Sequence, residues 1–142
     1  MSMDTYKIFF MGYRREEKMD GLPEYGGIYM VYRCIHNKDA KTVTLKELIY
    51  IGKSENIKER ITSHDKQEEF QKKLQEGEEI CYSYASVKEE EMDVVENGLI
   101  YMQKPPLNTQ YTRSFNYPDS HFIVEGRCAL LKHTDFSIEK TD

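Results

Sequence analysis

Residues 27–35 read Gly-Ile-Tyr-Met-Val-Tyr-Arg-Cys-Ile, and residues 43–51 read Val-Thr-Leu-Lys-Glu-Leu-Ile-Tyr-Ile, followed by Gly52. The first stretch is largely apolar on both of its alternating faces, which is typical of a strand inside a sheet that is covered on both sides. The polar residues 36–41 between the two stretches favour a turn. The two stretches therefore predict a β-hairpin at the centre of the fold.

A helix is predicted directly after this hairpin. Asn56 can accept a hydrogen bond at the helix start, and Glu59 three residues later completes a capping box. Apolar residues continue the helical pattern to Leu74, although the polar stretch 63–69 leaves room for a break. Residues 79–86 then predict a third strand, with large side chains on one face and small ones on the other.

A second helix is predicted to begin at another capping box, formed by Ser86 and Glu89, and to end at Gln103 because two prolines follow. Towards the termini, residues 6–11 predict a short edge strand, and residues 122–131 predict a strand or a bent hairpin. The Gly- and Pro-containing segment of residues 19–27 is read as a loop. The order β-β-α-β-α, with a strand added at each end, predicts an α+β fold with a small, mostly antiparallel sheet flanked by helices.

The length of 142 residues predicts a single domain spanning residues 1–142. The sequence lacks the ~18 consecutive apolar residues of a membrane span, and its start lacks the pattern of a signal peptide. Its three cysteines are scattered and form no CxxC pair, which favours a reducing compartment. We therefore expect a cytoplasmic protein with no membrane association.

The net charge of −5 is unevenly distributed: residues 65–96 hold 4 lysines against 11 acidic residues. The overall charge argues against a broad electrostatic nucleic-acid binder, although the rest of the chain can still present a cationic face. The four histidines lie far apart and none pairs with a cysteine at zinc spacing. A Gly-rich phosphate loop, a nucleophile elbow and a Cys–His dyad are also missing from the sequence.

Glu96 is out of place on the second predicted helix. At 100° per residue it falls inside the apolar arc formed by Met92, Val95, Leu99 and Ile100. A carboxylate in such an arc must be paired, hydrogen-bonded, metal-bound or protonated. A structural ion pair or a snorkelling surface glutamate explains this position as well as a functional site does.

Arg60 and His64 lie one turn apart on the first predicted helix, Lys53 precedes that helix, and Tyr50 ends the strand before it. The plain interpretation is a solvated helix face near a strand end. A functional interpretation requires all four to converge with Glu96 at one cleft.

Four other positions have ordinary structural explanations. Tyr29 can pack in the core with its hydroxyl at the rim, and Gly27 and Gly52 can be strand-end glycines. Asn108, which follows Pro-Pro-Leu, can be a turn residue.

Taken together, these residues resemble the GIY-YIG nuclease family. The triplets Gly27-Ile28-Tyr29 and Tyr50-Ile51-Gly52 reproduce its two signature motifs, and the continuation to His64 is similar to its second motif with a helix Arg and His. Glu96 in Glu-Asn-Gly-Leu-Ile and Asn108 in Pro-Pro-Leu-Asn match the family's later Glu and Asn.

The resemblance covers a core of about residues 26–109. It leaves an N-terminal extension, residues 1–25, and a C-terminal extension, residues 110–142.

The resemblance implies a divalent-metal-dependent endonuclease that hydrolyses phosphodiester bonds in DNA. Glu96 would hold a single Mg²⁺ or Mn²⁺, and Arg60 would hold the scissile phosphate. Tyr29 would be the general base or orient the attacking water, with Lys53 lowering the pKa of its phenol. These roles are expectations carried over from the family.

The remaining family positions receive less definite roles. Tyr50 and His64 would position the phosphate or assist proton transfer, and Asn108 would brace the site. Which of Tyr29, Tyr50 and His64 takes the proton stays open. Gly27, Gly52 and Ser54 are assigned to substrate binding.

The sequence departs from the family pattern between the two triplets, because residues 30–49 make the hairpin longer than usual. The insertion could contact DNA through Lys38, Lys41 and Lys46, or it could be an elongated surface hairpin. The acidic segment puts strong DNA affinity in doubt, and residues 1–142 show no separate DNA-binding part. Targeting is then expected from a partner protein, a homodimer or the extra termini.

Two alternatives stay open. The chain could be a catalytically weak or inactive module that keeps the fold to bind protein or nucleic acid. It could also be a structure-specific nuclease that acts on RNA or branched DNA.

Overall fold

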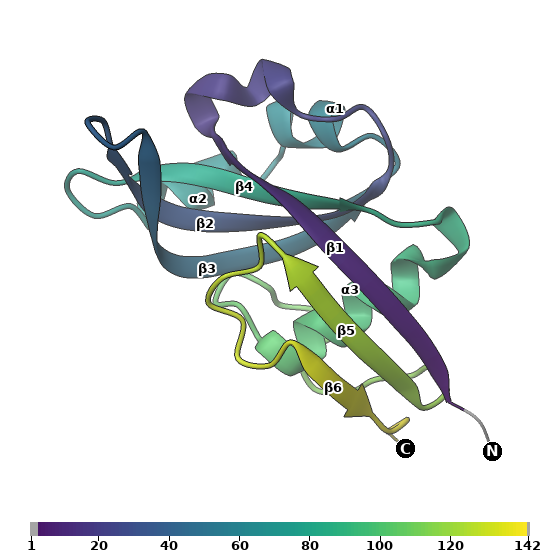
Figure 1. Cartoon of the computed structure of the whole chain (residues 1–142). Helices are drawn as coiled ribbons and strands as arrows, with labels where there is room; N and C mark the ends of the chain where they lie inside the picture. Colours follow the sequence, from purple (N-terminus) through teal and green to yellow (C-terminus); the bar gives the residue numbers. More distant parts are fainter. Residues whose placement is uncertain (1–2, 142) are drawn as a thin grey trace.

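The computed structural model describes residues 3–141 as one six-stranded sheet with helices on both faces (Figure 1). The strand order is β3-β2-β4-β1-β5-β6, and every neighbouring pair is antiparallel except β1 with β5. This architecture confirms the predicted α+β class. The elements are β1 (Asp4–Arg15), the 3-10 helix η1 (Glu16–Gly21), β2 (Gly27–Asn37), β3 (Thr42–Ser54), α1 (Ile57–Thr62), α2 (Gln67–Lys72), β4 (Glu79–Ser86), α3 (Glu89–Gln103), β5 (Ser120–Gly126) and β6 (Asp135–Ile138).

The hairpin of β2 and β3 lies where the sequence predicts it. β2 pairs with β3 on one side and β4 on the other, and its first six residues, from Gly27 to Tyr32, are all buried. β3 forms the edge of the sheet. The apolar character of both faces of β2 follows from this central position.

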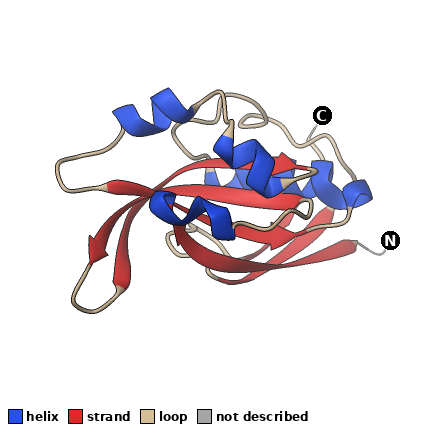
Figure 2. Cartoon of the chain, turned by 90° about the horizontal axis from the view of Figure 1, so that it is seen from above, coloured by secondary structure: helices blue, strands red, loops and turns tan. Residues whose placement is uncertain are grey.

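Two hydrophobic layers cover the sheet, one on each face. Figure 2 shows the strands of the sheet in red and the helices in blue. On the first face, which we call the α3 face, Val95 and Leu99 of α3 pack with Met30 and Tyr32 of β2. On the opposite face, the α1 face, the apolar residues of α1 and α2 pack with Tyr29, Val31 and the large side chains of β4. The alternation predicted for β4 is confirmed, because successive residues of that strand enter different layers.

The helix predicted after the hairpin is broken into α1 and α2 within its polar stretch. The Asn56 side chain caps α1 by accepting a hydrogen bond from the Glu59 N–H at 3.0 Å. The second half of the expected capping box is absent, since the Asn56 N–H is bound by the Ser54 hydroxyl instead.

The prediction of a second capping box, at Ser86 and Glu89, is wrong. Helix α3 begins one turn after Ser86, with Lys88 at the N-cap position and no side-chain cap. The helix ends at Gln103 as predicted, and Lys104 adopts a left-handed conformation that closes it.

The terminal strands differ most from the expectation. β1 is 12 residues long and lies inside the sheet between β4 and β5. The prediction of a short edge strand at this position is therefore wrong. β5 ends at Gly126, which has a φ of +88° and leaves no space for a Cβ beside the Phe10 carbonyl. The bent hairpin is completed by β6 rather than by residues 127–131. The predicted loop starts at residue 19, but its first three residues, 19–21, belong to the 3-10 helix η1.

Cys34, Cys81 and Cys128 are free thiols. In the part of the chain that the structure describes, no helix is both long and apolar enough to cross a membrane.

Candidate active site

A cavity of about 350 Å³ opens where the β2–β3 hairpin, α1, α3 and the chain after α3 meet. Seven of the ten predicted site residues line it, so segments far apart in the sequence converge at one place. These seven are Tyr29, Tyr50, Gly52, Lys53, Arg60, Glu96 and Asn108.

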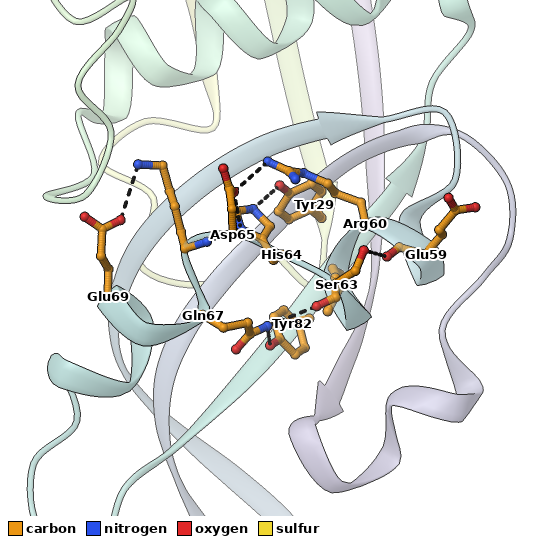
Figure 3. A network of polar contacts seen from close by, with 11 residues as sticks. Tyr29, Glu59, Arg60, Ser63, His64, Asp65, Gln67, Glu69 and Tyr82 are labelled. Carbon is orange, nitrogen blue, oxygen red and sulfur yellow. Dashed lines mark hydrogen bonds and ion pairs between the residues drawn. The ribbon is translucent and has the colours of Figure 1, made fainter.

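His64 lies directly behind this cavity and contacts Tyr29. Its Nε2 is 2.7 Å from the Tyr29 hydroxyl oxygen, and the Lys66 backbone N–H donates to its Nδ1 at 3.0 Å (Figure 3). Because Nδ1 accepts, the proton of a neutral His64 sits on Nε2, and His64 donates to Tyr29. In this state His64 cannot take a proton from the tyrosine.

Burial keeps this histidine neutral. Its side chain is fully enclosed, and burial, reinforced by the positive charge of Arg60, lowers the pKa of His64 to about 4. The exposed carboxylate of Asp65, 3.3 Å from Nδ1, only partly opposes this shift. Near neutral pH the Tyr29–His64 contact therefore joins two uncharged groups.

We expect His64 to make the fold acid-sensitive. An imidazole whose pKa is lower in the folded state stabilises the protein above its unfolded pKa of 6.5, and this contribution is lost as the pH falls towards 4. At pH 4.5 the loss is about 2.5 kcal/mol. Denaturant unfolding of the wild type and of a variant without the imidazole, each at pH 7 and pH 4.5, measures it, because the comparison cancels the contributions of the other titrating groups.

The matched variant is His64→Gln, whose amide can keep a donor near Tyr29 and does not titrate. It should lose less stability than the wild type over the same pH interval. Equal losses in the two proteins would contradict the assignment.

The phenol of Tyr29 is held in its protonated form. Burial and the neighbouring Tyr50 raise its pKa well above the ordinary value of 10, while the Arg60 guanidinium opposes the rise. Lys53 was expected to be the cation that acts on Tyr29. The structure instead pairs the Lys53 ammonium with Asp93 and places Arg60 beside the phenol.

Glu96 is buried on α3 and lines the cavity, with 8% of its surface exposed. Burial, reinforced by Asp93, raises the pKa of Glu96 to about 7, while Lys53 pulls it down. Within residues 3–141, no cationic side chain lies within 4.0 Å of its carboxylate. Neither a structural ion pair nor a snorkelling surface glutamate therefore describes this residue.

Arg60 extends from α1 to the cavity with 37% of its side chain exposed. Its partner is the exposed carboxylate of Asp65 at 3.2 Å, an ion pair that water screens. An incoming phosphate can therefore displace Asp65 at little cost.

Asn108 and Gly52 shape the cavity. The Asn108 side chain accepts from the Ile51 N–H at 3.0 Å and donates to the Ile51 carbonyl at 2.9 Å, which fastens the chain after α3 to the edge strand β3. A Cβ at Gly52 would lie 2.4 Å from the Tyr29 hydroxyl. Glycine is thus required to leave the tyrosine its place.

The structure does not bring Gly27 and Ser54 to this cavity. A Cβ at Gly27 would lie 1.8 Å from the Ala85 carbonyl, so this glycine permits close contact between β2 and β4. The Ser54 hydroxyl binds the main chain of Asn56 before α1. Their contacts are those of structural residues.

The family model of the GIY-YIG catalytic domain matches residues 25–110. The chain belongs to the GIY-YIG family. Its matched part contains the whole convergent set described above. No curated protein and no solved structure matches the chain significantly. The GIY-YIG assignment makes it a nuclease-type domain with a nucleic-acid substrate.

Sequence reasoning missed Lys66 of this GIY-YIG site. Its N–H sets the tautomer of His64, and its ammonium lies 5.8 Å from the centre of the Tyr50 ring at the cavity wall. Thr109, Gln110 and Tyr111 complete the wall beyond Asn108. Only the position of Lys66 two residues after His64 could have drawn attention to it.

Proposed function

We propose that this GIY-YIG domain is a divalent-metal-dependent endonuclease that hydrolyses phosphodiester bonds in DNA by attack of water. The observation that carries the proposal is the convergence of Tyr29, Arg60 and Glu96, from β2, α1 and α3, on one cavity. Phosphodiester hydrolysis needs a positioned water, a cation at the phosphate oxygens and help for the leaving oxygen. The cavity wall offers groups suited to the first two needs.

Arg60 is proposed to hold the scissile phosphate, since its guanidinium can donate two parallel hydrogen bonds and stays charged at all relevant pH values. Tyr29 is proposed to orient the attacking water. Its raised pKa keeps the hydroxyl protonated, and His64 donates to its oxygen, so the hydroxyl hydrogen is free to bind a ligand in the cavity. Tyr50 and Lys66 form the adjoining wall.

Glu96 fits the proposed Mg²⁺ or Mn²⁺. Its carboxylate is an oxygen donor of the kind that these hard cations prefer, and its raised pKa shows that the fold alone stabilises its charge poorly. A bound cation beside the carboxylate would stabilise its negative charge. When bound, the metal supplies Lewis-acid stabilisation of charge on the phosphate oxygens.

The alternative of an inactive binding module drew on the acidic segment 65–96. Part of that negative charge is neutralised by ion pairs within the fold, because Glu78 pairs with Arg33 at 2.6 Å and Glu79 pairs with Arg15 at 2.6 Å. The segment is thus a weaker argument for a partner surface than its composition suggests.

A plasmid-nicking assay tests the proposed function. We expect purified protein to nick supercoiled DNA with Mg²⁺ or Mn²⁺ and to leave it intact with EDTA, because no cationic side chain among residues 3–141 forms an ion pair with the buried Glu96 carboxylate. Parallel reactions on single-stranded, duplex and branched DNA and on RNA establish the substrate class. Intact plasmid under every metal condition would refute the endonuclease.

We further propose a cytoplasmic location, which the three free thiols support. Targeting by a homodimer or by a separate partner protein stays a proposal as well.

A further inference from the structure

A second, larger cleft lies away from the active-site cavity. It has a volume of about 430 Å³ and opens between the end of the β2–β3 hairpin, β1 and the chain after β5. Figure 1 shows the hairpin tip and the chain after β5 on the same side of β1. Side chains of Arg15, His36, Lys41 and Arg127 line the cleft.

Among the residues that the structure describes, two of these cations have no acidic partner. Within residues 3–141, neither Lys41 nor Arg127 has a carboxylate within 4.0 Å. Arg15, in contrast, is neutralised by Glu79 at 2.6 Å and by Glu17 at 3.4 Å. The cleft therefore keeps a net positive charge in an acidic protein.

His36 also lines the cleft. Its Nδ1 is buried without a hydrogen-bond partner among the described residues, which is unusual for a polar atom. The opposite wall is fixed in place: the Arg127 N–H donates to the Phe10 carbonyl at 2.8 Å, and the Tyr13 hydroxyl accepts from the Ala129 N–H at 3.0 Å. Arg127 thus projects from an anchored main chain.

Further cations lie between the cleft and the active site in the sequence. Lys46 on the edge strand β3 lines a third cavity together with Lys104 and Lys132. Lys46 follows Lys41, which directly precedes β3 and lines the cleft, and it comes before Lys53 at the active site. From Tyr29 to His36 the strand spans roughly 23 Å at ~3.3 Å per residue. This corresponds to about seven phosphates of one DNA strand.

We propose that the cleft is a second phosphate site, and that Lys41 and Arg127 hold the sugar–phosphate backbone of the DNA substrate away from the point of cleavage. The proposal rests on the proposed endonuclease function. Arginine and lysine at a concave site are the usual ligands of backbone phosphates, and such contacts position a substrate without reading its sequence. The elongated hairpin then contributes a DNA contact through Lys41.

The test compares Lys41→Gln/Arg127→Gln with the control Lys72→Gln/Lys140→Gln, which removes the same charge from exposed positions outside both cavities. Binding of a 5′-labelled duplex is measured by fluorescence anisotropy with EDTA over a range of salt. For the cleft variant alone, we expect about tenfold weaker DNA binding at low salt. The slope of log Kd against log salt concentration should also decrease, by the equivalent of up to about two phosphate contacts.

Cleavage kinetics give a readout that a structural role would not change. On a long duplex the cleft variant should raise KM with little change in kcat. On a stem of roughly six base pairs, too short to reach the cleft, it should equal the wild type. Thermal unfolding of the variant checks that its fold is intact.

The outcomes separate this proposal from the endonuclease itself. Equal binding and KM for cleft and control variants, with a wild type that cleaves, would overturn the second site and leave the endonuclease standing. If the wild type neither binds nor cleaves DNA, the proposed function fails. The cleft could also show a shift of the Arg127 side-chain NMR signal on titration with inorganic phosphate, without any binding of DNA. That result would overturn the proposal that the cleft holds a DNA backbone and would identify a free phosphate compound as its ligand.

Discussion

Replacing Glu96 with glutamine is expected to abolish metal-dependent nicking, with a loss of about a thousandfold or more. Glutamine keeps the shape of the side chain and removes the negative charge that would hold the cation. Metal stabilisation of phosphoryl oxygens contributes several kcal/mol, which corresponds to a loss of this size. Initial nicking rates with Mg²⁺ and Mn²⁺ measure the effect.

The same substitution should stabilise the metal-free protein above pH 7. A carboxyl whose pKa rises to about 7 on folding binds more protons in the folded state, so the contribution of Glu96 to the stability of the wild type declines between pH 4.5 and pH 7. Glutamine avoids this penalty, which is about 3 kcal/mol at pH 8. A loss of activity with a gain in stability cannot be attributed to unfolding.

Glu90→Gln is the matched control, because Glu90 lies exposed on the same helix. It should change neither nicking nor the pH dependence of stability. Substantial nicking by Glu96→Gln would remove Glu96 from the proposed metal site.

The sequence predicted the central elements because their patterns are local. The hairpin, β4 and the burial of Glu96 follow from alternation and from the 100° helical periodicity. The interior position of β1 was not evident from its short apolar run, since such a run does not show which strands lie beside it. Its pairing with β4 and β5 depends on contacts between distant segments.

The composition of the site was easier to predict than its electrostatics. The resemblance to the GIY-YIG motifs identified Tyr29, Arg60 and Glu96 as a set, and the structure brings them to one cavity. Which cation faces Tyr29 depends on side-chain directions, and Lys53 turns to Asp93 instead. The tautomer of His64 depends on one backbone N–H, that of Lys66, which no motif specifies.

Replacing Arg60 with glutamine is expected to lower kcat and kcat/KM by a similar factor of about a hundred to a thousand. Removal of one preorganised donor at a developing charge typically has an effect of this size. Arg60→Lys should recover only part of the loss, because an ammonium keeps the charge without the two-pronged geometry. Single-turnover cleavage of a labelled duplex measures both variants.

The fold should tolerate these changes, since Arg60 is part-exposed and its ion pair with Asp65 is screened by water. Lys58→Gln, two positions earlier on α1 and outside the cavity, removes the same charge and should cleave at the wild-type rate. If Lys58→Gln were as slow as Arg60→Gln, general electrostatic attraction would explain the loss. If Arg60→Gln kept the wild-type kcat, Arg60 would have no part in stabilising the transition state.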